Sequence, residues 1–80
     1  MTPESHPIQV AALYRFTPLG GLPALRQDLL ARCGELGIRG TLLIAGEGIN
    51  GTIAGSDDAI AAIVSHLRTL PGCGEIDVKY

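Results

Sequence analysis

Two kinds of hydrophobic pattern alternate along the 80 residues of this chain. Apolar residues recur at spacings of three and four over residues 22–36 and again over 60–67, which predicts two amphipathic helices. Short runs rich in β-branched, aliphatic and aromatic residues predict strands between and around them. We place these strands at residues 8–16, 41–45, 49–54 and 75–80. The predicted order is therefore strand, helix, strand, strand, helix, strand.

Local signals agree with these helices. Pro23 suits the first turn of a helix, and Gly37 suits the residue that ends it. Ser56 is a natural N-cap for the second helix. Asp57 and Asp58 follow it in the first turn, where the helix dipole favours negative charge.

This order predicts an α+β fold of the ferredoxin-like type, a split β-α-β-β-α-β sandwich like that of the acylphosphatases. Each half needs a right-handed crossover, and a hairpin joins the two halves. The expected product is a four-stranded antiparallel sheet with two helices on one face. The strands at 8–16 and 49–54 should be central, and the alternating strand at 75–80 should be an edge. The other sheet face would be uncovered.

The hairpin stretch from Gly40 to Gly55 reads G-T-L-L-I-A-G-E-G-I-N-G-T-I-A-G. Gly46 and Gly48 can supply the tight turn. Gly51 lies inside a predicted strand, which indicates either a bulge or the close approach of another backbone or a ligand. The letters G-x-G-x-x-G also occur here, but a dinucleotide site needs a helix directly after them, and a strand follows instead.

The run A-G-E-G-I-N-G-T-I-A-G, with L-Y-R-F in the first strand, resembles the N-terminal domain of the rhodanese-containing tRNA uridine hydroxylases. The resemblance covers essentially the whole chain, and E-G-I-N-G is its specific part. It implies a parent protein that hydroxylates the wobble uridine of tRNA at carbon five, with molecular oxygen as co-substrate. It also implies an essential cysteine in a rhodanese domain that we expect after residue 80, outside this chain. That domain, and tRNA through the full-length protein, are the expected partners.

Composition limits what the domain can do alone. A net charge of −2 lacks the basic excess of a domain that binds nucleic acid by itself, so any RNA contact should be auxiliary or rely on a local patch. Cys33 and Cys73 lie far apart with no C-x-x-C motif, so we expect neither a metal nor a disulfide, and no cofactor in this chain.

Residues 1–7 carry no secretory signal and should be flexible. With no apolar run near the roughly 20 residues of a membrane helix, we expect a cytoplasmic protein without a membrane partner.

The chain offers no evident catalytic residue, so we expect this domain to be silent on its own. Our candidates for an RNA or domain interface are Arg15, Glu47, Gly48, Asn50 and Lys79. No sequence neighbour of Glu47 would shift its pKa toward the value that a general acid or base needs, so we do not expect it to be catalytic. It is then either a solvated turn residue or an interface residue. The Asn50 amide suits a base edge or a domain interface, or else bonds its own backbone near the turn.

The register decides whether these candidates meet. If the helices cover the face with Val10 and Tyr14, then Arg15 and Asn50 share the open face, and Lys79 joins them from the edge strand. Such a patch would meet tRNA backbone or dock the missing domain. The other interpretation of Arg15 is a solvated charge near the strand end.

Two other functions fit the fold. A small-ligand-binding regulatory module is compatible with it. An acylphosphatase needs an arginine in the loop after the first strand and an asparagine on the second. The loop over residues 17–21 has no arginine and the strand over 41–45 has no asparagine, so we expect no acyl phosphate hydrolysis.

Overall fold

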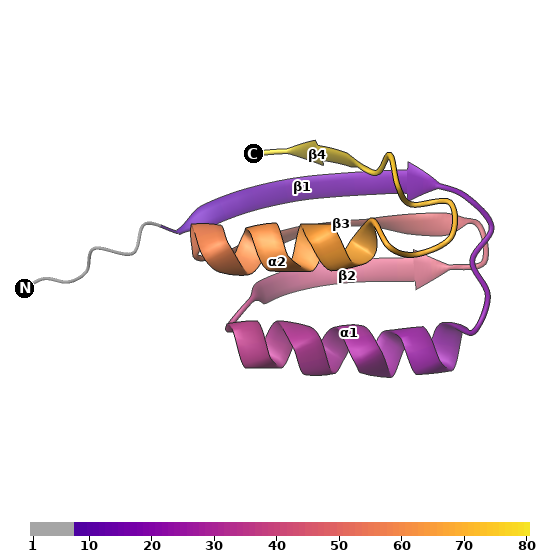
Figure 1. Ribbon diagram of the computed structural model, residues 1–80, viewed down its shortest axis with the longest axis horizontal. Helices are drawn as coiled ribbons and strands as arrows, with labels where there is room; N and C mark the ends of the chain where they lie inside the picture. The colour runs from indigo at the N-terminus through magenta and orange to yellow at the C-terminus, as the bar shows by residue number, and fades with distance from the viewer. Residues whose placement is uncertain (1–7) are drawn as a thin grey trace, which may run out of the picture.

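The computed structural model describes residues 8–80, and the segment 1–7 that we expect to be flexible lies outside the described residues. The elements follow in the order β1 (Gln9–Phe16), α1 (Leu22–Leu36), β2 (Arg39–Ala45), β3 (Gly48–Gly55), α2 (Asp57–Leu67) and β4 (Asp77–Lys79). The strands form one antiparallel sheet in the order β2-β3-β1-β4. Both helices lie on one side of this sheet (Figure 1). The predicted ferredoxin-like fold, with β1 and β3 at its centre, is confirmed.

The helix ends have the expected chemistry. Pro23 lies in the first turn of α1, and Gly37 ends that helix in the left-handed conformation with φ of 71°. The Ser56 hydroxyl accepts a hydrogen bond of 3.1 Å from the backbone N–H of Ala59. It thereby satisfies one of the free N–H groups at the start of α2.

The core lies mainly between α2 and the two central strands. From α1, only Leu29 is a buried hydrophobic residue, whereas α2 buries an almost continuous stripe. The buried core residues are Ala11, Leu13, Leu29, Ile49, Ile53, Ile60, Ile63, Val64, Leu67, Cys73 and Ile76. Helix α2 therefore supplies most of the helical side chains in the core, whereas α1, which lies beside β2, supplies only Leu29.

Glycines in and beside β3 let the neighbouring strands approach closely. The pairing of β3 with β1 and with β2 is continuous, so the strand contains no bulge. A Cβ atom on Gly51 would overlap the backbone oxygen of Thr41 in β2, and one on Gly48 would overlap that of Arg15 in β1. Of the two explanations for a glycine inside this strand, the close approach of another backbone is the correct one.

The hairpin turn is tied to the loop that follows β1. Ala45 pairs with Gly48, which leaves Gly46 and Glu47 as a two-residue turn. Their carbonyl oxygens accept hydrogen bonds of 3.0 Å from the N–H groups of Leu19 and Thr17, respectively. The backbone of the glycine-rich turn is thus part of the scaffold.

We expect Gly51→Ala to lower the free energy of unfolding by at least about 2 kcal/mol, because the new methyl group would push β2 away from β3. Gly46→Ala is the matched control, since nothing lies within 4 Å of a Cβ atom at that turn position. Urea titrations of both variants measure the difference. Equal midpoints for the two variants would contradict the close-approach explanation.

Candidate functional site

The sheet face opposite the helices is uncovered, and we call it the open face. The strand pairing places on it Val10, Ala12, Tyr14 and Phe16 of β1, Arg39, Thr41 and Leu43 of β2, Asn50 and Thr52 of β3, and Asp77 and Lys79 of β4. Its large apolar side chains are strongly exposed: Phe16 by 79%, Leu43 by 59% and Tyr14 by 53%. This small domain of 80 residues thus exposes aromatic side chains whose burial would have been favourable, which is typical of a contact surface.

Tyr14 is at the centre of this face. It lies opposite Asn50 on one side and Asp77 on the other, and Asn50 in turn lies opposite Leu43. The rings of Tyr14 and Phe16 meet edge to face, with centroids 6.3 Å apart and planes at 60°. This geometry is a favourable one for two aromatic rings and leaves ring surface open to solvent.

The charges of the open face lie at its edges. Lys79 pairs with Ala12 on the β4 side, and Arg39 pairs with Ala54 on the β2 side. Asp77 adds one carboxylate beside Tyr14. The open face is therefore mainly aromatic and polar at its centre, with Lys79 at one edge and, at the other, Arg39, whose side chain also lines the groove described below.

Arg15 does not lie on the open face, so that prediction is wrong. It pairs with Ile49, which is buried against α2, and its side chain therefore belongs to the helix side. Its Nε donates a hydrogen bond of 2.9 Å to the backbone oxygen of Gly72, in the loop after α2. Arg15 is thus a partly exposed cation near the strand end whose hydrogen bond links β1 to that loop.

The expected orientation of β1 is reversed, since Ala11 and Leu13 are buried while Val10 and Tyr14 are exposed. In the antiparallel register Leu13 faces Gly51 and Ala11 faces Ile53, so these side chains join the isoleucines under the helices. Apolar residues on both faces of β1 did not reveal which set would be buried. The predicted uncovered face was itself a signal that apolar residues would be exposed. One of the two apolar sets of the central strand β1 has to point to that face.

The other candidates are divided between the two sides. Asn50 and Lys79 lie exposed on the open face, as expected. The Glu47 side chain is exposed in the turn, while its backbone oxygen is used by Thr17. Gly48 is buried against β1 and offers no surface to a partner. Their roles in binding remain predictions.

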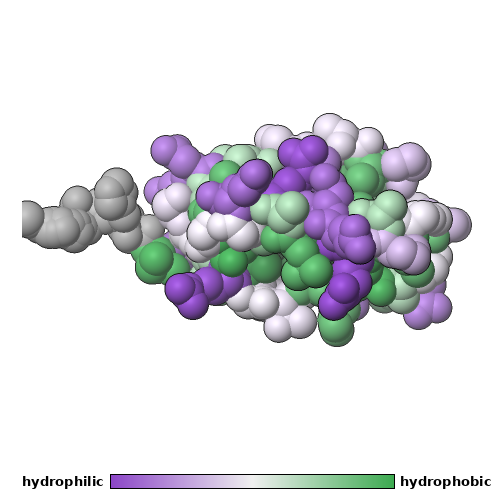
Figure 2. Space-filling view, turned by 90° about the horizontal axis from the view of Figure 1, so that it is seen from below, coloured by the Kyte–Doolittle hydropathy of each residue, from purple (hydrophilic) through white to green (hydrophobic). Residues whose placement is uncertain are grey.

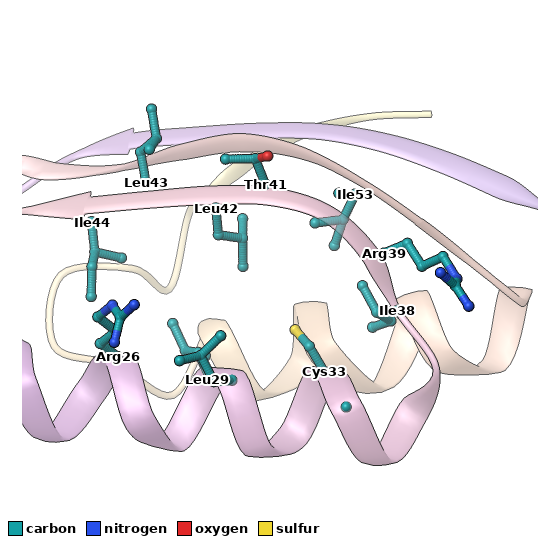
Figure 3. A pocket seen from close by; sticks show the side chains of 13 residues that line it. Arg26, Leu29, Cys33, Ile38, Arg39, Thr41, Leu42, Leu43, Ile44 and Ile53 are labelled. Carbon is teal, nitrogen blue, oxygen red and sulfur yellow. The ribbon is translucent and has the colours of Figure 1, made fainter.

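A groove of about 580 Å³ runs between α1 and β2. Leu29 and Cys33 point into it from the helix, and Leu42 and Ile44 point into it from the strand (Figure 3). Its remaining lining includes Arg26 and Arg39, which lie toward opposite ends in this view, and Leu30, which is 58% exposed. Figure 2 views the molecule from this side and shows apolar surface between hydrophilic side chains. Sequence reasoning missed this groove, because a helical stripe does not reveal how tightly it will be covered.

One carboxylate links the two helices. Asp28 of α1 accepts a hydrogen bond of 2.8 Å from Nε2 of His66 in α2 and one of 3.0 Å from Nε of Arg32. These two bonds hold the pKa of Asp28 below its ordinary value. His66 is therefore partly buried in a contact that joins the helices.

Both thiols are free, and burial raises the pKa of each. A raised pKa makes a thiol a poorer nucleophile at neutral pH. Within residues 8–80, no three His, Cys, Asp or Glu side chains gather in a way that could hold a metal ion. No helix in this part of the chain is long and apolar enough to cross a membrane.

The loop after β1 is not free to cradle a phosphate. It contains no arginine, and its Thr17 and Leu19 N–H groups already donate to the hairpin turn. Strand β2 contains no asparagine. The absence of acyl phosphate hydrolysis stays a prediction with a structural reason behind it.

The fold and the open face define a ferredoxin-like α+β domain with one sheet surface left for contacts. The chain matches the UPF0176 acylphosphatase-like domain over residues 8–80, and it belongs to that family.

Several relatives carry the name tRNA uridine(34) hydroxylase. The protein of Mesorhizobium japonicum is 51% identical over 82 residues, a match that covers 100% of this chain and 26% of the relative. That of Gluconobacter oxydans is 48% identical over 79 residues, covering 99% and 25%, respectively. That of Caulobacter vibrioides is 55% identical over 71 residues, covering 89% and 22%. The resemblance to tRNA uridine hydroxylases is therefore confirmed, and the chain spans about a quarter of the length of these curated relatives.

We expect Asp28→Asn to destabilise the domain at neutral pH, and the loss to shrink in acid. Because the folded pKa of Asp28 is lowered, its contribution is complete above the ordinary value of 3.8 and disappears as the pH falls through the folded value. Denaturation midpoints over a pH series measure this. Glu35→Gln, an exposed carboxyl on the same helix, is the control. A difference from wild type that stays constant down to the acid limit would show that the contact does not depend on the charge of Asp28.

Proposed function

We propose that this chain is a non-catalytic accessory domain of a tRNA uridine(34) hydroxylase and that its open face contacts the tRNA substrate. The observation that carries the proposal is the exposed surface around Tyr14, Phe16 and Asn50 on the two central strands. The names of the relatives, which specify a tRNA nucleotide as the site of reaction, support RNA as the partner. The two free thiols with raised pKa values support a role without chemistry of its own.

The proposal includes a division of labour in the parent protein. The reaction, hydroxylation of the wobble uridine at carbon five with molecular oxygen, would belong to a rhodanese domain that carries the essential cysteine. This chain would position the tRNA or dock that domain, in a cytoplasmic protein. The length of the relatives, of which this chain matches only about a quarter, leaves room for such a domain.

A second function, the binding of a small ligand, is favoured by the groove between α1 and β2. Its volume of about 580 Å³ lies within the range of roughly 300–1,000 Å³ that is usual for small-molecule sites. The lining is mostly apolar, and Arg26 and Arg39 add positive charge. An aliphatic acid has the matching chemistry.

We expect Lys79→Ala to weaken the binding of this chain to a tRNA transcript and to lower the salt slope by about one. The reason is that Lys79 is an exposed cation on the open face and can meet one phosphate. Fluorescence anisotropy at several salt concentrations measures both quantities. Arg68→Ala is the matched control, because Arg68 is an exposed cation at the end of α2. Equal effects of the two substitutions would argue against a specific contact through the open face.

For the groove, we expect octanoate to slow the alkylation of Cys33 by iodoacetamide. The Cys33 thiol points into the groove and is only half buried, whereas Cys73 is fully buried and should not react in the folded chain. Octanol, which lacks the carboxylate, should protect Cys33 less. An alkylation rate that octanoate leaves unchanged would remove small-ligand binding in the groove from consideration.

A further inference from the structure

We infer that the open face binds single-stranded RNA by stacking nucleobases on Tyr14 and Phe16, while the Asn50 amide hydrogen-bonds the edge of a stacked base. This inference rests on the proposed function and names the form of RNA that the face recognises. It differs from a contact with the phosphates of a double helix, because the bases of a helix are already stacked on one another and their faces are unavailable.

The two rings have no place in the core. Phe16 is 79% exposed and Tyr14 is 53% exposed, while the smaller Ala11 and Leu13 of the same strand fill the space under the helices. Exposed aromatic rings are the groups on which unpaired bases stack, and every base has a face that can do so. Strands β3 and β4 flank Tyr14 on both sides, whereas Phe16 lies beyond the last residue that β4 pairs with and is flanked by β3 alone.

Asn50 is the polar group best placed to read a base. It lies directly opposite Tyr14, is exposed, and makes no side-chain hydrogen bond with residues 8–80. An amide donates and accepts at once, and uracil offers a ring N–H donor beside carbonyl acceptors. Thr52, the next residue of β3 on the same face, adds a hydroxyl with both capacities.

The charge of the face also favours stacking over phosphate binding. Lys79 and Arg39 lie at opposite edges, and Asp77 lies beside Tyr14. So few cations can neutralise only one or two phosphates, which predicts a shallow salt dependence. Stacking supplies affinity without a basic surface, which reconciles RNA binding with a net charge of −2.

The arrangement also matches a general mode of RNA recognition. Some four-stranded sheets bind single-stranded RNA by stacking bases on aromatic residues of their open surface. Here the central strand β1 supplies the rings, and the central strand β3 supplies the hydrogen-bonding groups. A docked protein domain would bury the same rings, but it would leave no reason for the binding to depend on unpaired bases.

The test uses a labelled, uridine-rich single-stranded RNA oligonucleotide and the same RNA annealed to its complement. We expect the single strand to bind more tightly than the duplex. Tyr14→Ala and Phe16→Ala should each weaken binding to the single strand by roughly tenfold, with the salt slope unchanged. Tyr14→Phe should retain most of the affinity, since it keeps the ring. Leu36→Ala, at an exposed apolar residue at the end of α1 and outside the groove, should have no effect.

Tyrosine fluorescence gives a second readout. The chain has two tyrosines and no tryptophan, so Tyr80→Phe leaves Tyr14 as the only tyrosine. A base stacked on that ring should quench its emission as the RNA is added. Emission that is unchanged at saturation would overturn the assignment of Tyr14.

The outcomes separate this inference from the proposed function. If Lys79→Ala weakens tRNA binding while the aromatic variants do not, stacking is wrong and a phosphate contact by the open face stands. If neither kind of variant changes binding, the open face does not bind RNA and both proposals fail. Equal affinity for duplex and single strand would overturn the stacking inference alone.

Discussion

The close backbone contact of β3 with its two neighbours is the constraint on which the rest of the sheet depends. Gly48 lies against the Arg15 backbone and Gly51 against the Thr41 backbone, and a Cβ atom at either glycine would overlap the opposing oxygen. Strands held this closely cannot shift by one residue without placing a side chain in that space. The glycines of the E-G-I-N-G motif therefore specify pairing, while its Asn50 lies on the open face and its Glu47 side chain is exposed in the turn.

That register determines what the domain presents to its surroundings. With Leu13 opposite Gly51, the buried side of β1 contains small and aliphatic residues, and the rings of Tyr14 and Phe16 must point to the open face. Arg15, on the buried side but near the strand end, reaches the carbonyl of Gly72 and stabilises the loop after α2. The same strand pairing thus places Arg15 within reach of Gly72 and leaves the two aromatic rings exposed.

Unequal packing of the two helices adds a second surface. Because α2 covers the central strands and α1 is left beside the edge strand, the apolar groove stays open along β2. Leu43 borders this groove and points away from α1 toward the open face (Figure 3). The two surfaces meet at β2.

The E-G-I-N-G motif of the sequence carried the resemblance to the tRNA uridine hydroxylases. The sequence by itself also determined the order of elements, the hairpin and the helix caps. These three features depend on local conformation and on hydrophobic period, which neighbouring residues specify. Only the tertiary structure decided which face of β1 is buried, that Arg15 bonds Gly72, and that α1 leaves a groove. The physical reason is that both faces of β1 are apolar, so its own pattern is ambiguous. The orientation is determined by contacts with β3, a strand more than thirty residues away in the chain.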